Sequence, residues 1–500
     1  MRISVQPRPS ARLRAVAIVI GLWLVVSGLT TWAATPSVIT ILHFNDVYEI
    51  DTVEGGRAGG LARVATILDR LKRTAAPVMS TLGGDYLSPS AIGTARVDGQ
   101  ALAGRQMVAV LNALGLEWAT FGNHEFDVSE AAFHARLAEG TFHLVSSNVT
   151  DAAGKPFEHT VTSAIVPVRL GKRTVNLGLV GVTIDSTVKP WVKYAPPIES
   201  AKAAIAQLTG HVDAVIALTH LSLAGDQQLV TAVPEIDVVL GGHEHENWMM
   251  RRGPHFTPII KADANVRSLA IVSLGFGAAG TRPTVSARLE IVDDHTPPQP
   301  RVDAEVKRWM TLGFDGFRRD GFTPEAVVAT STDSLDGRES TVRNGPGLLS
   351  DIITAAMSHE AAPVDLAIFN GGSIRIDDVL TPGPIREYDI IRVLPFGGKV
   401  LKAAMDCALI SQVLDIGVTN RGTGGYLHAA GVTRSGGGWQ IQGKPIDPAA
   451  RYLVAISDFL LTGGETGLAF LTRTNPQVHD VRELRDIRMT VIDELKRRYK

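Results

Sequence analysis

The hexapeptide Gly122-Asn123-His124-Glu125-Phe126-Asp127 follows a short apolar run, residues 116–121, that is typical of a buried strand. Asn123 and His124 are therefore expected just beyond the carboxyl end of that strand, where ligands collect in open α/β sheets. Asn, His and Asp supply a carbonyl oxygen, an imidazole nitrogen and a carboxylate, which are donors that bind divalent metals. A single peptide of this kind also fits an Asn cap beside a surface histidine, so its interpretation depends on the rest of the chain.

Four further apolar runs in the first half of the chain end in residues that can bind a metal. With their terminal residues, these runs are 41–46 (Asp46), 79–85 (Asp85), 214–220 (His220) and 238–245 (His243 and His245). Helix-like segments lie between the runs, and this alternation of strand and helix predicts an α/β fold in layers. Glycine pairs precede Asp85 and His243, and glycine lets the backbone turn sharply and approach an ion.

A pair of divalent ions about 3.5–4 Å apart is a common device for cleaving phosphoesters. One carboxylate bridges the ions, and His, Asn and Asp side chains fill the remaining positions. The candidate donors in this chain are Asp46, Asp85, Asn123, His220, His243 and His245. The alternative is that each residue caps its own strand end, which fits any one segment but does not explain five in succession.

The order of the segments ND, GGD, GNHEFD, ALTH and GGHEH resembles the calcineurin-like metallophosphatase domain of the 5'-nucleotidase family. That family includes periplasmic UDP-sugar hydrolases and cell-surface nucleotidases. The resemblance implies an α/β protein with an N-terminal β-sandwich flanked by helices and a smaller α/β C-terminal domain for substrate recognition. It also implies two divalent metal ions, such as Zn²⁺ or Mn²⁺, as cofactors.

The resemblance also implies a role for each donor. Asp85 would bridge the ions, Asn123, His220 and His243 would complete one site, and Asp46 and His245 would serve the other. His124 and Asp127 would form a catalytic dyad. In such a dyad the imidazolium stabilises charge on the phosphoryl oxygens, and the carboxylate orients the ring.

One position departs from the family pattern. The family has Asn-Asp-x-His at the first segment, whereas this chain has Asn45-Asp46-Val47-Tyr48. A phenol, with an ordinary pKa of about 10, is a poor ligand for a divalent ion unless the metal ionises it. We therefore expect this metal site to bind more weakly, to take an extra water, or to prefer a harder ion such as Mn²⁺. His43 should point to the opposite face of the strand from Asp46, so it is not a candidate replacement.

Residues 1–34 have the pattern of a secretory signal, with several arginines, an apolar run over residues 15–29, and small residues near position 33. The apolar run is shorter than the roughly 20 residues that span a bilayer. This favours a cleaved signal over the alternative, an uncleaved membrane anchor. We expect a periplasmic or extracellular protein with no stable membrane insertion after cleavage. The single cysteine, Cys407, excludes an intrachain disulfide.

A length of 500 residues suggests two or three domains. The chain is 45% hydrophobic and 20% charged, as globular proteins are, and its net charge of −2 gives no reason to expect nucleic-acid binding. Three prolines within residues 297–300 favour an extended backbone and indicate a domain boundary. The predicted parts are a signal peptide (1–34), a metallophosphatase domain (35–295), a linker with a connecting helix (296–325) and a C-terminal domain (326–500).

The C-terminal domain contains an apolar strand, residues 365–369, followed at once by Asn370, two glycines and Arg375 in the stretch NGGSIR. A guanidinium beside a glycine turn suits an anionic ligand because it pairs with phosphate, although a plain turn fits the pattern equally well. The stretch also matches the Asn-Gly-Gly-x-x-Arg of the family's nucleotide-recognising domain, which implies that Asn370 and Arg375 bind substrate.

Further substrate-binding residues follow from the same resemblance. Arg343 has the position of a phosphate- or substrate-binding arginine, Phe396 (LPFGG) of a ring that stacks on a base, and Tyr426 (GGYL) of a pocket-lining aromatic. The family's Gly-Gly-Asp-Gly-aromatic motif is altered over residues 463–470. The second stacking ring is therefore either missing or displaced to Phe470. Phe396 and Phe470 also fit as core residues.

The resemblance implies a secreted hydrolase in which a metal-bound hydroxide releases phosphate from a nucleotide or related small phosphoester. Tyr48 and a shortened turn after Arg343 leave open a catalytically impaired periplasmic nucleotide-binding protein. A thiosulfohydrolase-like enzyme on the same fold is a further alternative, against which Phe396 and NGGSIR favour nucleotides. The sequence gives no prediction of the oligomeric state.

Overall fold

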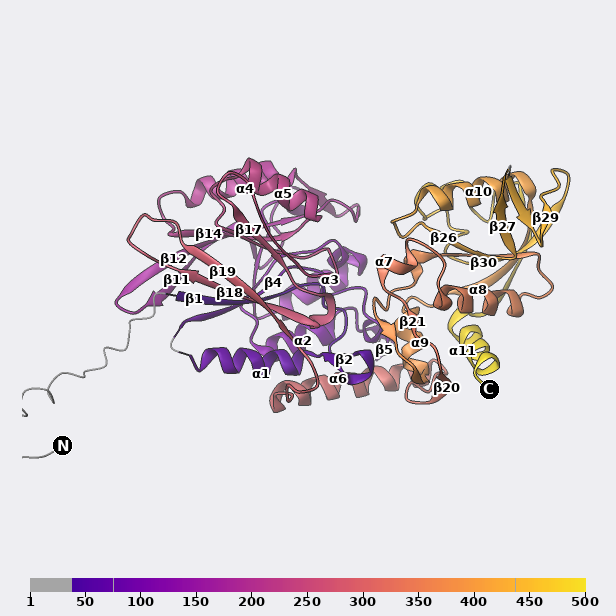
Figure 1. Ribbon diagram of the computed structural model, residues 1–500, viewed down its shortest axis with the longest axis horizontal. Coiled ribbons are helices and arrows are strands. Elements are labelled where there is room, and N and C mark those ends of the chain that lie inside the picture. Colours follow the sequence, from indigo (N-terminus) through magenta and orange to yellow (C-terminus); the bar gives the residue numbers. More distant parts are fainter. Residues whose placement is uncertain (1–37, 75, 437) are drawn as a thin grey trace, which may run out of the picture.

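The computed structural model describes residues 38–74, 76–436 and 438–500, so the expected signal peptide lies outside the described part. Figure 1 shows two lobes, an N-terminal one in indigo to magenta and a C-terminal one in orange to yellow. The long helix α6 (Pro300–Arg319) runs beneath the first lobe toward the second. In the described ranges, no helix has the length and apolarity needed to cross a membrane.

Two mixed sheets form the centre of the N-terminal lobe. Their strand orders are β10-β8-β7-β4-β1-β18-β19 and β11-β12-β14-β15-β17-β16. The strands of the first are β1 (Val38–Phe44), β4 (Val78–Leu82), β7 (Trp118–Ala119), β8 (His143–Val145), β10 (Thr160–Val161), β18 (Ser268–Gly275) and β19 (Thr284–Ile291). Those of the second are β11 (Ser163–Leu170), β12 (Arg173–Thr183), β14 (Ala214–His220), β15 (Val238–Gly241), β16 (Trp248–Arg252) and β17 (Thr257–Lys261).

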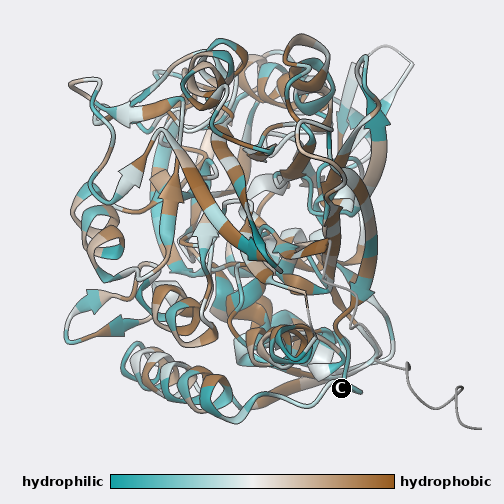
Figure 2. Cartoon of the chain, turned by 90° about the vertical axis from the view of Figure 1, so that its left-hand side faces the viewer, coloured by the Kyte–Doolittle hydropathy of each residue, from teal (hydrophilic) through white to brown (hydrophobic). Residues whose placement is uncertain are grey.

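The two sheets pack face to face. Ile39 and Ile41 of β1 belong to one buried cluster with Leu177, Ile216 and Leu240 of the other sheet. Because side chains alternate along a strand, the intervening residues of β1 point to the opposite face and pack against helices. In Figure 2 the inner strands are largely brown, and the surface helices alternate teal and brown. The predicted α/β fold with an N-terminal sandwich flanked by helices is thus confirmed.

Helices cover both outer faces of the sandwich. On the side of β1 these are α1 (Leu61–Lys72), α2 (Arg105–Leu114), α3 (Glu130–Glu139) and α6; on the side of β14 they are α4 (Pro197–Leu208) and α5 (Leu223–Ala232). Helix α1 is amphipathic, and its buried residues, such as Leu61, Val64, Leu68 and Leu71, recur every three to four positions. Helix α6 packs on α1 and α2 and occupies most of the segment expected to connect the domains.

Because these strands pair in parallel, the carboxyl ends that carry the candidate metal ligands lie at one edge of each sheet. Strand β4 runs parallel to β1 and to β7, and β14 runs parallel to β12 and β15. The carboxyl ends of β1, β4 and β7 therefore point the same way, as do those of β14 and β15. Strand β7 is shorter than the predicted strand at 116–121, and Gly122, just beyond that segment, lies against Asp85 in the loop that follows β4.

The C-terminal lobe is built on a five-stranded sheet with the order β26-β22-β30-β25-β31. These strands are β22 (Leu366–Asn370), β25 (Lys399–Asp406), β26 (Leu427–Ala430), β30 (Arg451–Ser457) and β31 (Val478–Asp486). Helices α8 (Leu348–Glu360) and α11 (Ile487–Arg498) cover one face, and α10 (Cys407–Thr419) covers the other. A hairpin extension carries β27 (Val432–Ser435), β28 (Gly438–Ile441) and β29 (Lys444–Pro445).

Several short elements of the second lobe lie against the first (Figure 1). They are β20 (Val327–Ser331), β21 (Leu335–Asp336), α7 (Glu339–Val342), β23 (Val379–Leu380), β24 (Gly383–Arg386) and α9 (Glu387–Val393). One apolar cluster continues from the first lobe through Trp309 and Phe317 of α6 to Ile385 and Ile390. The contacts hold the loop between η5 (Gly371–Ser373) and β23 near the strand ends of the sandwich.

Candidate metal centre and substrate pocket

Asp46 and Asp85 follow β1 and β4, and both have an unusual backbone conformation. Their φ angles are +52° and +55°, in the left-handed region that non-glycine residues seldom occupy. Such strain persists where surrounding structure enforces it, and it clusters at functional sites. Here the backbone amides of Asp46 and Val47 donate to the carbonyls of Gly84 and Asp85, so the two loops hold each other in place.

Asp46, Asp85 and His220 form a buried group in which one donor atom of each lies within 4.8 Å of the others. His220 Nδ1 lies 2.7 Å from the carbonyl oxygen of Gly83, so its Nε2 points to the carboxylates, 3.1 Å from Asp85 Oδ2. Although burial opposes it, the charges of Asp85 and Asp46 raise the pKa of His220 to about 9. Burial raises the pKa of Asp46, whereas against the effect of burial His220 and His124 hold the pKa of Asp85 below its ordinary value. A group that stabilises positive charge this strongly suits a cation.

His243 and Asn123 lie next to this group. The backbone amide of His243 donates to Asp46 Oδ2 at 2.9 Å, and its ring meets the ring of His220 edge to face at 5.3 Å. Burial and the charge of His220 lower the pKa of His243 to about 3, so its ring is neutral, the form that binds metals. Among the described residues, the buried Oδ1 of Asn123 has no hydrogen-bond partner. An unpaired buried acceptor of this kind also fits a metal ligand.

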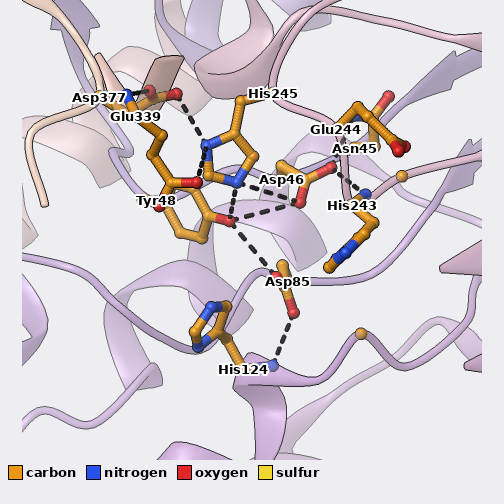
Figure 3. A network of polar contacts seen from close by, with 12 residues as sticks. Asn45, Asp46, Tyr48, Asp85, His124, His243, Glu244, His245, Glu339 and Asp377 are labelled. Atoms are coloured by element: carbon orange, nitrogen blue, oxygen red, sulfur yellow. Dashed lines mark hydrogen bonds and ion pairs between the residues drawn. The ribbon is translucent and has the colours of Figure 1, made fainter. Parts of the chain in front are cut away.

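His245 connects the group to the C-terminal lobe (Figure 3). Its Nδ1 lies 2.8 Å from Asp377 Oδ2, which leaves Nε2 facing Asp46 Oδ1 at 3.7 Å and the Tyr48 hydroxyl at 2.9 Å. Although burial opposes it, Asp377 and Glu339 raise the pKa of His245 to about 10. A carboxylate that holds one ring nitrogen while the other faces the site is the usual support of a metal-binding histidine.

Tyr48 stands where the family has a histidine. Its hydroxyl lies 3.3 Å from Asp46 Oδ1 and 3.3 Å from Asp85 Oδ2, and the side chain is buried. Burial and these carboxylates raise the pKa of Tyr48 well above its ordinary value. His43 lies outside the group, as predicted, because its ring contacts the Thr81 hydroxyl and the Gly241 carbonyl.

The predicted dyad lies at the edge of the buried group. His124 begins the short helix η3 (His124–Asp127), and its backbone amide donates to Asp85 Oδ1 at 2.8 Å. His124 Nδ1 is 2.5 Å from Asp127 Oδ2, and Arg375 of the C-terminal lobe approaches His124 Nε2 to 3.2 Å. The imidazole is thus oriented on one side by a carboxylate and flanked on the other by a guanidinium.

Glu125 is a residue of the hexapeptide to which sequence reasoning gave no role. Its buried carboxylate accepts hydrogen bonds from the backbone amides of Asp85 at 2.9 Å, Tyr86 at 2.6 Å and Leu87 at 3.1 Å. Burial and the charge of Asp85 raise its pKa to about 7. Glu125 therefore ties the loop after β7 to the loop that carries Asp85. The available signal was a carboxylate placed between the dyad histidine His124 and the buried Phe126.

A cavity of about 750 Å³ adjoins the dyad and lies mostly in the C-terminal lobe. Asp127 lines it on the N-terminal side, and Asn370, Arg375 and Phe396 line it on the other. Phe459, which sequence reasoning did not select, also lines the cavity. Phe396 and Phe459 are 59% and 42% exposed, which is unusual for large apolar rings and suits two surfaces that receive a ligand.

The other three predicted substrate residues are not among the cavity's lining residues. Arg343 pairs with Glu339, which also lies 3.5 Å from Arg375. The ring of Tyr426 packs edge-on against His428 at 5.2 Å. Phe470 packs against the apolar cluster between the C-terminal sheet and α10. Phe470 is thus half-buried against the core, and the exposed ring is that of Phe459.

Comparison with known proteins agrees with this architecture. The family model of the calcineurin-like phosphoesterases matches residues 39–247, and that of the 5'-nucleotidase C-terminal domain matches residues 327–472. The 5'-nucleotidase of Bos taurus is 24% identical over 458 residues, covering 81% of this chain and 76% of that protein. Protein UshA of Yersinia enterocolitica is 24% identical over 500 aligned residues, covering 85% and 86%.

The fold itself also matches a solved structure. The 5'-nucleotidase precursor from Thermus thermophilus superposes with a TM-score of 0.75 at 21% identity, over 92% of this chain and 97% of that one. Fold, donor group and family matches together define a metal-dependent phosphoesterase with two domains. The chain belongs to the 5'-nucleotidase family.

Proposed function

We propose that this protein is an exported enzyme that releases phosphate from nucleotides or related small phosphoesters. The observation that carries the proposal is the position of the buried group of Asp46, Asp85 and His220. It lies beside the His124–Asp127 pair, and that pair adjoins a cavity large enough for a nucleotide. The related bovine enzyme is named a 5'-nucleotidase. The arginine-rich and then apolar N-terminus supports export to the periplasm or the outside of the cell.

The donor set supports two divalent ions. Asp85 would serve both, Asn123, His220 and His243 would hold one, and Asp46 and His245 would hold the other. The unpaired Asn123 oxygen and the neutral His243 ring fit this assignment. When bound, such ions supply charge that activates water and stabilises the phosphoryl group.

The residues of the chain position the substrate around that centre. Asp127 holds the ring of His124 so that Nε2 faces the space beside Arg375, where both groups can bind phosphoryl oxygens. His124 can also pass a proton to the leaving oxygen. In the cavity, Phe396 and Phe459 offer two ring faces for a base, and Asn370, fixed by Glu465 at 2.8 Å, offers polar contacts. The N-terminal domain would thus carry the chemistry and the C-terminal domain the recognition.

The test uses mature protein that is stripped with a chelator and resupplied with Mn²⁺, Zn²⁺ or Co²⁺. We expect phosphate release from AMP or an aryl phosphate, or cleavage of a UDP-sugar to UMP and a sugar 1-phosphate. His124→Ala should lower kcat by about 10²–10⁴-fold, because it removes a positioned charge and proton donor. His211→Ala, at an exposed histidine of the same lobe, is the matched control and should keep full activity.

A second candidate function rests on Tyr48. A phenol hydroxyl between two carboxylates, where the family has a histidine, could leave a nucleotide-binding protein without turnover. Nucleotide binding by the metal-loaded protein, with no phosphate released under any of the three metals, would favour this function. Cleavage of a sulfur ester in place of phosphoesters in the same panel would instead favour a thiosulfohydrolase-like activity.

A further inference from the structure

Lys261 is a fully buried cation at the carboxyl end of β17, and the proposed chemistry gives it no role. Strand β17 pairs in parallel with β15, and β15 pairs in parallel with β14, so Lys261 lies level with Gly241 and Thr219. These two residues stand just before the loops that carry His243 and His220. Lys261 is thus at the same edge of the sheet as these histidines.

Four acceptors surround the ammonium nitrogen of Lys261. Nζ donates to the backbone carbonyls of Leu221 at 2.6 Å and Gly242 at 2.7 Å, and to the carboxylate of Glu244. It also pairs with Asp226 Oδ2, which lies 2.9 Å away on helix α5. Because an ammonium group has three protons, the two carbonyls and Glu244 are enough to satisfy it.

Three of these acceptors belong to residues that adjoin the proposed histidine ligands in the sequence. The carbonyls come from the residue after His220 and the residue before His243, and Glu244 lies between His243 and His245. Glu244 Oε1 also accepts the backbone amide of Leu223 at 2.6 Å, so this carboxylate joins the two histidine loops to each other. The ammonium group and one carboxylate therefore connect the loops that carry all three histidines.

Stability alone explains a buried lysine at this position poorly. Taking a charge out of water costs several kcal/mol, and apolar residues can often replace a buried ion pair with no loss of stability. The two preceding residues of β17, Ile259 and Ile260, are buried and apolar. The turn before His243 also leaves room for the lysine, because a Cβ at Gly241 would lie 3.0 Å from Lys261 Cε. What an apolar side chain could not do here is bind two carbonyls and a carboxylate.

We propose that Lys261 is a positioning residue, which fixes the backbone of the two histidine loops and so presents His220, His243 and His245 to the ions. It acts through the loops and is not itself a ligand. Asp377 orients one histidine ring, whereas Lys261 holds the backbone from which all three rings extend. This role rests on the proposed function, because it requires that these histidines bind divalent ions.

The experiment compares the two carboxylates that pair with Lys261. Full-length mature protein is stripped of metal and titrated with Zn²⁺ in a calorimeter. Glu244→Gln keeps one acceptor but places an amide donor against either Lys261 or the Leu223 amide, so it should weaken Zn²⁺ binding by about 10–100-fold. Asp226→Asn is the matched control: the ammonium keeps three acceptors, and the affinity for Zn²⁺ should change by less than twofold.

Two further measurements separate positioning from a purely structural role. Lys261→Met removes the ammonium group and should weaken Zn²⁺ binding at least as much as Glu244→Gln. The visible absorption of bound Co²⁺ depends on the geometry of its ligands. It should change in Glu244→Gln and Lys261→Met and should stay as in the wild type in Asp226→Asn. If Lys261→Met does not fold, the comparison of Glu244→Gln with Asp226→Asn decides.

The proposal is overturned if Glu244→Gln, or a folded Lys261→Met, lowers the unfolding temperature but keeps wild-type Zn²⁺ affinity and the wild-type Co²⁺ spectrum. Equal losses of affinity in Glu244→Gln and Asp226→Asn would also overturn it, because only Glu244 joins the histidine loops. In either case, a wild type that binds Zn²⁺ leaves the proposed function intact. If the wild type binds none of Zn²⁺, Mn²⁺ and Co²⁺, the proposed function fails as well.

Discussion

His43 is a buried imidazole that lies one layer beneath the metal ligands. Its ring contacts the Thr81 hydroxyl at 2.9 Å and the Gly241 carbonyl at 3.1 Å, and it is fully buried. Thr81 precedes the loop of Asp85, and Gly241 precedes that of His243. The single ring therefore links β4 of one sheet to β15 of the other below the site. Burial favours the neutral form of this ring.

The titration of His43 should appear in the stability of the protein. Burial lowers its pKa to about 4, whereas the ring has an ordinary pKa of 6.5 in the unfolded chain. Between these values the unfolded state binds more protons, so stability falls as the pH falls from 6.5 to 4. The loss from this one residue is about 3 kcal/mol. Urea unfolding across this range should show a steeper pH dependence for the wild type than for His43→Gln. Equal slopes would show that His43 does not titrate in this way.

The loops after β4 and β7 pass too close to each other for any residue with a side chain. A Cβ at Gly122 would lie 2.1 Å from Asp85 Oδ1, and one at Gly84 would lie 2.4 Å from the backbone nitrogen of Gly122. Gly84 also has a φ of +87°. Glycine at these positions thus lets the carboxylate of Asp85 and the hexapeptide meet at one point.

Gly84→Ala should therefore damage the site beyond its cost in backbone strain. Gly115→Ala is the matched control, because Gly115 has a similar φ of +79° but has nothing within 4 Å of its Cβ position. We expect both variants to lose about 1–2 kcal/mol from strain. Only Gly84→Ala should also weaken metal binding, by at least tenfold, in calorimetric titrations of stripped protein. Equal metal affinities in the two variants would contradict a role for this close approach.

The meeting of strand ends was predictable from sequence, because each apolar run ends in a donor and parallel strands share an edge. This rule alone predicts that Asp46, Asp85 and His220 lie close together. The direction of His245 and the place of Tyr48 could not be predicted in the same way, since both depend on contacts between loops far apart in the chain. The sequence pattern also could not identify the second aromatic residue of the pocket. Phe459 and Phe470 lie in one segment, and only the packing of this segment decides that Phe459 lines the cavity while Phe470 is half-buried against the apolar cluster.

The two exposed rings of the pocket provide a test of base recognition. Stacking contributes about 1–3 kcal/mol per base, so Phe396→Ala and Phe459→Ala should each raise KM for AMP by roughly 5- to 150-fold. Ribose 5-phosphate has the same phosphate ester and no base, and its KM should change by less than twofold. The measurement is steady-state phosphate release with both substrates. A parallel loss with ribose 5-phosphate would show that the rings support the fold of the pocket and do not contact a base.

At the scale of the whole molecule, the two lobes share one site. The C-terminal lobe contributes Arg375 beside His124 and Asp377 beside His245. A second contact lies behind them, where Arg392 pairs with Asp378 at 3.0 Å and with Glu49 of the first lobe at 3.6 Å. Metal binding and the docking of the lobes should therefore be coupled, since an ion that holds His245 in place also favours its bond to Asp377.

Asp377→Asn tests this coupling, because asparagine tolerates the φ of +41° at this position but removes the charge and one of the two acceptor oxygens. Removing the carboxylate that orients a metal-binding histidine typically costs 10–100-fold in metal affinity. We expect a loss of about tenfold in calorimetry, although the substituted residue lies in the other lobe. Asp378→Asn is the neighbouring control: it breaks the pair with Arg392 and should lower the unfolding temperature while metal affinity stays the same. If both variants lost stability and neither lost metal affinity, Asp377 would hold the lobes together without orienting His245, and the metal centre would belong to the first lobe alone.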